Sequence, residues 1–338
     1  MRPTASLFVT GGAGFIGSAF IRYLLRSPDF TGRILNYDLL TYAGNLEFLK
    51  GFHTHPRYHF VQGNILNQPL VERLLLEREI DTLVHFAAET HVDRSIASAQ
   101  PFIETNVKGT LSLLEAVRKV PHIHFHHIST DEVYGSLGES GAFNETSPYR
   151  PNSPYSASKA ASDHLVRAFT QTYGVSTTIS HCSNNYGPCQ NGEKLIPLMI
   201  RNCLKKKPLP IYGRGANIRD WLYVDDHAEA IWRILQKGKK GGTYAIGGKT
   251  ELSNLELVHL LISLIHPENP RDLHSLIRFV QDRPGHDFRY ALDPSKMEKE
   301  LHWQPRTSLK EGLLRTIRWY SEPFSMRSFS RRKFLIGK

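Results

Sequence analysis

The chain has 338 residues, of which 40% are hydrophobic and 22% are charged, and its formal net charge is +10. These values are typical of a globular protein with two compact units, and no apolar run approaches the ~20 residues that span a membrane. Three cysteines without Cys-x-x-Cys spacing argue against a disulfide framework and a zinc site. We therefore expect a cytoplasmic protein without a signal peptide.

The N-terminal segment predicts a dinucleotide-binding unit. Residues 6–10 form a short apolar strand and residues 18–26 have helical periodicity. Between them, Gly11, Gly14 and Gly17 give Gly-x-x-Gly-x-x-Gly, one residue different from the dinucleotide fingerprint. Glycine permits a tight turn and a close approach to a pyrophosphate, and the helix N-terminus offers N–H groups to the phosphates. Alone, such a run is a weak signal.

A second strand strengthens this prediction and indicates which dinucleotide binds. Residues 33–37 are mostly apolar and lead into Asp38, ~20 residues after Gly17. An acidic side chain there can accept hydrogen bonds from the adenosine ribose hydroxyls, and its charge repels a 2′-phosphate. We therefore expect NAD rather than NADP.

The middle of the chain alternates strands and helices, the pattern of a doubly wound parallel sheet. The expected strands are 58–62, 82–86, 122–129 and 176–181, and the expected helices are 69–78, 101–118 and 155–173. Ligands of such sheets gather at the carboxyl ends of the strands. Residues 87–90 and 130–132 directly follow strands, so we expect both segments at that edge.

Two short runs carry the candidate chemistry. Tyr155 and Lys159 are four residues apart and share one face of a helix. A nearby ammonium is expected to lower the phenol pKa from about 10. Such a pair is sufficient for hydride transfer. Asp131 and Glu132, in the run 129–135, add carboxyl groups that can move protons, which suggests a second reaction.

These motifs resemble those of the extended short-chain dehydrogenases/reductases and, within them, the dTDP-glucose 4,6-dehydratase family of sugar-nucleotide dehydratases. The resemblance runs from residue 8 to about residue 320 and rests on Thr10–Gly17, Leu40–Leu46, Ala87–Ser95, Asn184–Pro188, Glu193–Pro197 and Asp282–Asp287. The glycine run and the Tyr/Lys pair are shared across the superfamily. The Thr130-Asp131-Glu132 triplet and the segment 282–287 narrow the match to the dehydratases.

The resemblance implies an α/β fold with a Rossmann-like doubly wound parallel sheet and a smaller α/β substrate-binding domain. We assign residues 1–186 and 219–248 to the NAD-binding domain, and residues 187–218 and 249–322 to the nucleotide-sugar-binding domain. Residues 323–338 form a basic tail, interpreted as a disordered end, with attachment to an acidic surface as the alternative. A homodimer joined through helices 101–118 and 155–173 is also implied, without a nucleic-acid partner.

The implied activity is dehydration of dTDP-glucose to dTDP-4-keto-6-deoxyglucose, a step of deoxysugar biosynthesis, with tightly bound NAD regenerated in each turnover. Tyr155, as phenolate, would take the proton of the 4-hydroxyl, beside Lys159. Glu132 would remove the C5 proton, and protonated Asp131 would donate to the departing C6 hydroxyl. Thr130 would hydrogen-bond the 4-hydroxyl.

The resemblance also implies two sets of binding residues. On the cofactor side they are Gly11, Gly14, Phe15, Ile16, Gly17, Asp38, Leu40, Thr41, Gly44, Asn64, Ile65, Ala87, Ala88, Thr105, Tyr155, Lys159 and Asn185. On the substrate side they are Thr90, Thr130, Asp131, Glu132, Asn184, Lys194, Leu195, Pro210, Ile211, Tyr212, Arg219, Asn254, Arg283 and His286. Arg219 is assigned to the diphosphate in preference to the run 205–207, because a guanidinium can bind phosphate oxygens bidentately.

Several positions depart from the family pattern. Asn64 replaces the usual aspartate beside the adenine, and Leu39 replaces a frequent lysine beside the ribose. The segment 189–192 replaces an aromatic, proline-containing loop near the substrate. UDP- or CDP-sugars therefore remain alternative substrates.

Three further alternatives come from the residues themselves. A sugar-nucleotide 4-epimerase shares the Tyr/Lys pair but needs neither a C5 base nor a C6 acid. The second alternative is a non-catalytic NAD-binding regulator, in which the acids Asp131 and Glu132 are not needed for NAD binding. A histidine run, residues 122–127, places three imidazoles on one strand face, but a buried strand offers poor geometry for a metal, so we expect none.

Overall fold

The structure is a computed structural model that describes residues 4–322. The predicted basic tail, 323–338, lies outside the described residues. None of the helices between residues 4 and 322 combines the length and apolar character that a membrane-spanning segment needs.

A seven-stranded sheet forms the centre of the larger part of the molecule, and all its neighbouring strands are parallel. In spatial order the strands are β3 (Tyr58–Gln62), β2 (Arg33–Asp38), β1 (Ser6–Thr10), β4 (Thr82–His85), β5 (His124–Thr130), β6 (Ser176–Cys182) and β10 (Gly242–Ile246). The order reverses between β1 and β4, the position at which such sheets bind ligands. The predicted doubly wound fold is confirmed.

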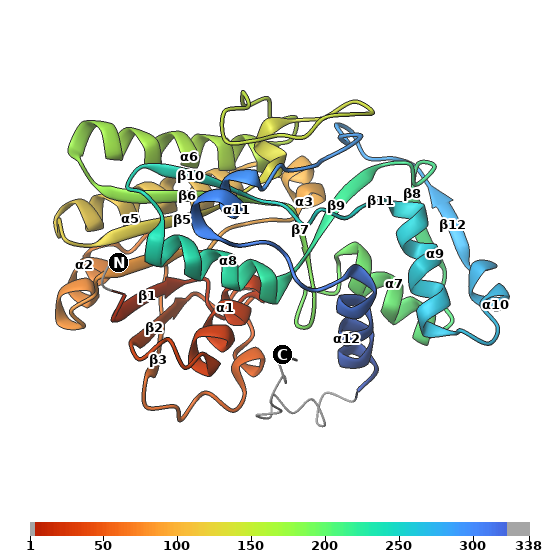
Figure 1. Cartoon of the computed structure of the whole chain (residues 1–338), viewed down its shortest axis with the longest axis horizontal. Coiled ribbons are helices and arrows are strands. Elements are labelled where there is room, and N and C mark those ends of the chain that lie inside the picture. Colours follow the sequence, from red (N-terminus) through yellow and green to blue (C-terminus); the bar gives the residue numbers. More distant parts are fainter. Residues whose placement is uncertain (1–3, 323–338) are drawn as a thin grey trace.

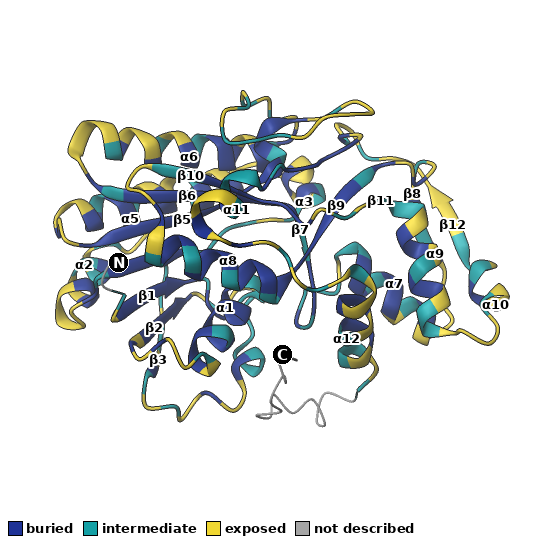
Figure 2. Ribbon diagram, viewed as in Figure 1, coloured by how far each residue is buried: buried dark blue, intermediate teal, exposed yellow. Residues whose placement is uncertain are grey.

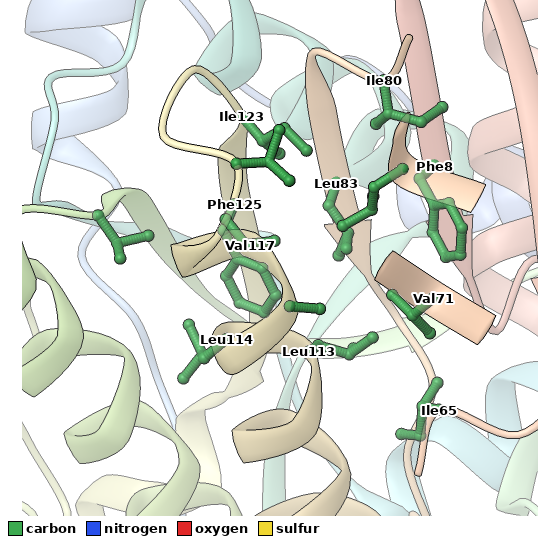
Figure 3. Packing of buried hydrophobic residues seen from close by; sticks show 14 of the residues in the cluster. Phe8, Ile65, Val71, Ile80, Leu83, Leu113, Leu114, Val117, Ile123 and Phe125 are labelled. Atoms are coloured by element: carbon green, nitrogen blue, oxygen red, sulfur yellow. The ribbon is translucent and has the colours of Figure 1, made fainter. Parts of the chain in front are cut away.

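Helices cover both faces of this sheet (Figure 1). On one face lie α2 (Gln68–Glu77), α5 (Gly109–Arg118) and α6 (Pro154–Tyr173), and on the other lie α1 (Phe15–Arg26) and α8 (Val224–Lys237). Because successive strand residues point to opposite faces, Phe8 packs with Val71 of α2 and Leu113 of α5 (Figure 3), whereas Leu7 and Val9 pack with the other cluster. The central strands β1 and β5 are accordingly buried along their whole length, whereas the edge strand β3 is partly exposed (Figure 2).

The predicted helix 101–118 is interrupted. It consists of α4 (Gln100–Phe102), a π-helical segment η2 (Ile103–Lys108) and α5. The backbone carbonyl of Asn106 accepts hydrogen bonds from the hydroxyls of Thr110 and Ser162, at 2.6 and 2.7 Å. Both bonds reach a carbonyl inside the π-helical segment, and such interruptions of a helix are often found near functional sites.

The smaller part of the molecule lies at the right of Figure 1. Its strands are β7 (Asn184–Tyr186), β9 (Ile218–Tyr223) and β11 (Glu251–Ser253) in one sheet, and β8 (Leu209–Tyr212) and β12 (Ile277–Val280) in another. Its helices are α7 (Leu195–Leu204), α9 (Asn254–Ile265), α10 (Arg271–His274) and α12 (Leu309–Ser321), which share one hydrophobic cluster with these strands. The short elements η1 (Leu46–Leu49), α3 (Val92–Ala97), η3 (Asp131–Tyr134) and α11 (Ser295–Leu301) complete the described chain.

The division into domains by residue number stays a prediction. β10 and α8 belong to the larger sheet and its helices, whereas β7 and β9, also assigned to the NAD-binding domain, pair with each other in a separate sheet. Within the segment assigned to the smaller domain, however, Met297, Leu301 and Trp303 pack with residues of α8 and β10.

The histidine run lies in and before β5. His122 precedes the strand, and its Nε2 lies 3.2 Å from the carbonyl of Ile80. His124 and His126 both contact the Thr178 hydroxyl, at 2.9 and 2.8 Å. Within residues 4–322 no group of three or more histidine, cysteine or acidic side chains is arranged to hold a metal ion.

Candidate active site

A cavity of about 760 Å³ runs along the carboxyl ends of the central strands. Its lining begins at the turn after β1, continues through the segments that follow β2, β4 and β5, and extends to the loop before α7. This is the edge at which the alternating pattern predicts a ligand, and the cavity spans the reversal of strand order between β1 and β4.

The glycine turn leaves no room for side chains. Gly11 has φ +69°, and a Cβ there would lie 2.6 Å from the backbone nitrogen of Ala87. At Gly17 it would lie 2.4 Å from the carbonyl of Gly11, so the helix packs directly on the turn. Helix α1 begins at Phe15, and its N-cap, Gly14, makes no side-chain capping bond. The first-turn N–H groups are thereby presented to the cavity, which suits a diphosphate.

Asp38 stands at the end of β2 with both carboxylate oxygens held by backbone. Its Oδ2 accepts from the N–H of Ala13 at 2.9 Å, and its Oδ1 accepts from the N–H of Leu40 at 2.8 Å. Burial raises the pKa of this carboxyl, while the two hydrogen bonds oppose the shift. The lone pairs left over can accept ribose hydroxyls, and the glycine turn and this fixed acid together fit a dinucleotide without a 2′-phosphate.

Asn64 also lines the cavity, and its Oδ1 already accepts the N–H of Leu66 at 2.9 Å. The amide oxygen keeps a second lone pair for an adenine amino group. The predicted role of Asn64 is therefore sterically and chemically possible despite the replaced aspartate.

Thr130, Asp131 and Glu132 follow one another at the end of β5 and the start of η3, and all three line the cavity. Asp131 is buried; its Oδ1 accepts from the Thr130 hydroxyl at 3.2 Å, and its Oδ2 has no partner among the described residues. Burial, and then the charges of Glu132 and Asp220, raise the pKa of Asp131 well above its usual value. This favours the protonated acid at neutral pH.

Glu132 lies in a different electrostatic environment from its neighbour. Burial raises its pKa, but the cationic side chains of Arg283, Lys194 and Arg219 oppose that rise. The two adjacent carboxyls therefore differ in the way that a proton donor and a proton acceptor require.

Tyr155 and Lys159 lie in the first two turns of α6, which starts with a capping box between Ser153 and Ser156. Both side chains are buried and line the same cavity as Asp131. The expected lowering of the Tyr155 pKa is wrong for this structure: burial, and then the charge of Glu132, raise it well above the usual value, and only a hydrogen bond with Thr130 prominently opposes the rise.

Lys159 explains why that expectation fails. Its Nζ donates to the backbone carbonyl of Ile128 at 2.7 Å, at the end of β5. Burial lowers the pKa of Lys159 to about 8. The spacing places the two side chains on one helix face, as predicted, but the spacing alone does not give the direction in which the ammonium points.

The cavity gathers most of the predicted site residues, but not all. Every predicted cofactor-side residue lines it except Leu40, which instead supplies its N–H to Asp38. On the substrate side the cavity is lined by Thr90, Thr130, Asp131, Glu132, Asn184 and Lys194. The lining does not include Leu195, Pro210, Ile211, Tyr212, Arg219, Asn254, Arg283 or His286.

Arg219 is an example of the predicted substrate-side residues that do not line the cavity. Its guanidinium donates to the backbone carbonyls of Ile218 and Asp287, at 2.7 and 3.0 Å, and its Cζ lies 4.4 Å from the centre of the Tyr290 ring. The assignment of Arg219 to a diphosphate remains a prediction.

Sequence reasoning missed a group of side chains that joins the two parts of the molecule beside the cavity. The Arg94 guanidinium lies 3.9 Å from the centre of the Tyr42 ring and 2.7 Å from the Glu193 carboxylate. The Tyr42 hydroxyl donates to Glu89 at 2.9 Å. We call Tyr42, Glu89, Arg94 and Glu193 the latch. All four fall within segments that carry the family resemblance, so that signal could have found them.

Two other lining residues, Phe48 and Trp319, had no signal in the sequence. Phe48 and Trp319 meet edge to face, with ring centroids 6.4 Å apart, although they are far apart in the chain. The departing loop 189–192 also lines the cavity, and Gln190 Nε2 donates to the carbonyl of Asn185 at 2.8 Å.

Comparison with known proteins agrees with this geometry. The chain is 51% identical over 330 residues to dTDP-glucose 4,6-dehydratase of Neisseria meningitidis, covering 93% of this chain and 92% of that protein. The crystal structure of dTDP-glucose 4,6-dehydratase from Streptomyces venezuelae with NAD bound has a TM-score of 0.88 at 48% identity, covering 93% of this chain and 96% of that one. UDP-glucose 4-epimerase of Thermotoga maritima has a TM-score of 0.84 at 27% identity, covering 93% and 98%.

The family model described as GDP-mannose 4,6 dehydratase matches residues 8–316, nearly all of the described chain. The chain therefore belongs to the GDP-mannose 4,6 dehydratase family.

Proposed function

We propose that this protein is an NAD-dependent hydro-lyase that converts dTDP-glucose to dTDP-4-keto-6-deoxyglucose. The observation that carries the proposal is the pair Asp131 and Glu132, adjacent in one cavity with Tyr155 but differing in the charges around them. Relatives at about 50% identity over most of the chain are dTDP-glucose 4,6-dehydratases, and solved relatives hold NAD.

The glycine turn, the N-terminus of α1 and Asp38 would hold NAD, with Asn64, Thr105 and Asn185 beside it. When bound, NAD would supply the hydride acceptor for C4 and, once reduced, the hydride donor for C6. The chain's own residues have to move the protons.

Tyr155, as phenolate, takes the proton of the glucose 4-hydroxyl; the hydrogen bond with Thr130 favours that form, while burial and the charge of Glu132 oppose it. The 4-keto group acidifies the C5 hydrogen, which Glu132 removes. Asp131, kept protonated by its surroundings, donates its proton to the C6 hydroxyl, which leaves as water. Protonation of C5 and arrival of the hydride at C6 give the 4-keto-6-deoxy sugar.

A 4-epimerase is the second candidate, because solved epimerases share the fold at 27–29% identity. Epimerisation at C4 needs the tyrosine and the cofactor but no proton removal at C5. The paired acids have no task in that reaction, which is why dehydration is favoured.

Incubation with dTDP-glucose in deuterated water separates the two functions. Dehydration should incorporate deuterium at C5 of a 4-keto-6-deoxy product, without consumption of added NAD. Recovery of dTDP-galactose alone, without C5 deuterium, would show the epimerase instead. A parallel assay with UDP- and CDP-glucose tests which nucleobase is preferred. The question arises because the loop 189–192, near the substrate, differs from that of the family.

The protein is further proposed to act in the cytoplasm and as a homodimer. Ile103, Leu111 and Tyr173 support the dimer, because they are large hydrophobic side chains left 38–50% exposed on η2, α5 and α6. The nucleotide-sugar contacts of Leu195, Pro210, Ile211, Tyr212, Arg219, Asn254, Arg283 and His286 also belong to the proposal.

A further inference from the structure

A buried polar network lies behind Lys159 and has no task in the reaction as described. At its centre is Asp163, one turn further along α6 and 2% exposed. Its Oδ2 accepts from the hydroxyls of Ser129 and Tyr149, at 2.8 and 3.1 Å, and lies 3.0 Å from Nε2 of His181. The network thus ties α6 to β5, to β6 and to the segment before the helix.

His127 connects this carboxylate to the active-site lysine. Its Nε2 lies 3.3 Å from Asp163 Oδ1 and 3.4 Å from Lys159 Nζ, in the interior of β5. Burial, followed by the charge of Lys159, lowers the pKa of His127 to about 4, so the imidazole is neutral at pH 7. In a neutral ring Nε2 either donates to Asp163 or accepts from Lys159, so His127 bonds one of them at a time and adds no charge between them.

The charges around Lys159 leave Asp163 as its counter-ion. Burial alone would raise the pKa of Asp163, but the contacts with His127 and His181 hold it well below the usual value, so it is an anion. Two further titratable groups beside the pair are neutral: burial raises the pKa of the Cys182 thiol on β6, and burial with the nearby His127 lowers that of His85 on β4.

An isolated ammonium in such a site would lose its proton, since burial disfavours the charged form. For Lys159 burial lowers the pKa, and Asp163 is the larger of the two groups that raise it again. The i, i+4 spacing of the two residues places them on adjacent turns of one helix face.

We propose that Asp163 is a positioning residue that keeps Lys159 protonated and directed toward the cavity, acting through its charge and through His127. The inference rests on the proposed function in one respect, namely that Lys159 takes part in the reaction. It adds to the Tyr/Lys pair a third member of the same helix face, at positions 155, 159 and 163.

The test is a pH titration of the holoenzyme carrying Asp163→Asn, which keeps the shape of the side chain and removes its charge. Activity should fall as pH rises through the pKa of Lys159, because the ammonium is the active form. Loss of the anion should move this basic limb of kcat/KM to lower pH by about one unit. Nitrogen-15 NMR of lysine side chains, with the Lys159 signal assigned by its loss in Lys159→Met, should show the same displacement without substrate.

Tyr149→Phe is the matched control, because it removes a neutral hydrogen bond to the same carboxylate and should leave both titrations where they are. Asp163→Ser carries the test if Asp163→Asn does not fold. The proposal is overturned if the wild type and the Asp163 variants titrate at the same pH and the variants differ only in a lower melting temperature. Asp163 would then be a structural residue. An equal shift in Tyr149→Phe would overturn the proposal too. If wild type dehydrates nothing, the proposed function fails, while the NMR titration still decides this inference.

Discussion

Asp131 and Glu132 are neighbours in the chain, yet the charges that reach them differ. Asp131 faces the carboxyls of Glu132 and Asp220, whereas Glu132 faces the cations Arg283 and Lys194. Like charges raise a carboxyl pKa and opposite charges lower it. This difference supports the proposed assignment of acid to Asp131 and base to Glu132, which the residue types alone cannot provide.

Substituting each carboxyl by its amide tests that assignment. Asp131→Asn and Glu132→Gln should each reduce turnover ~10²–10⁴-fold, the usual contribution of a general acid or base. In deuterated water, unreacted substrate recovered from Asp131→Asn should carry deuterium at C5, because the base still works. Substrate recovered from Glu132→Gln should carry none. The opposite labelling pattern would exchange the two roles.

The acid limb of the pH profile tests the environment of Glu132. A base is active when deprotonated, so kcat/KM should fall as pH drops through the raised pKa of Glu132, at a pH above that of an ordinary glutamate. Lys194→Met removes a cation that lowers this pKa and should move the limb to still higher pH. The measurement is kcat/KM for dTDP-glucose across pH 4 to about 8. A limb unchanged in Lys194→Met would mean that another group is titrating.

The sequence predicted which residues line the cavity better than it predicted how their side chains are oriented. Tyr155 and Lys159 share a helix face, as their spacing requires, but Lys159 donates to the Ile128 carbonyl of a strand remote in the sequence. The sequence did not point to Asp163, because its partners His127 and His181 lie on two different strands that only the fold brings beside α6. Side-chain direction in a buried site depends on such long-range neighbours.

The hydrophobic pattern of the sequence predicted the bounds of whole strands and helices where one or both faces of the element are buried. Residues 58–62 form β3 with the predicted bounds, and helix 155–173 differs from α6 by one residue. The interruption of helix 101–118 by a π-helical segment was not predicted, and one contact within it, from the Ser162 hydroxyl to the Asn106 carbonyl, comes from another helix.

The turn between β1 and α1 allows a stability prediction at the same scale. Gly11→Ala forces a left-handed conformation that costs about 1–2 kcal/mol and drives a Cβ into the backbone of Ala87. Gly51→Ala is the matched control, because Gly51 has φ +90° but open space around its Cβ. Thermal unfolding should show the greater loss in Gly11→Ala, which should also lose bound dinucleotide. Equal losses in both variants would show that the close approach to Ala87 carries no cost.

The two parts of the molecule have separate hydrophobic clusters and meet at the cavity. The latch residues Arg94 and Glu193 form a hydrogen-bonded ion pair across that meeting place. Substrate-side residues such as Arg219 and Asn254 belong to the smaller part. Arg219 and Asn254 do not line the cavity, so the resemblance identified residues of the smaller part without showing which of them reach the cavity.

The outer surface of α5 and α6 leads to the prediction about assembly. Leu111 is 38% exposed on α5, and Tyr173 is 50% exposed at the end of α6. If a second copy covers them, Leu111→Glu buries a charge in the interface and should convert the dimer to monomer, since an unpaired buried charge costs far more than an exposed one. Leu76→Glu is the control, because Leu76 is 62% exposed on α2, on the same side of the sheet. Light scattering after gel filtration should give half the mass for Leu111→Glu only. A monomeric wild type would disprove the dimer, and a dimeric Leu111→Glu would move the interface to another surface.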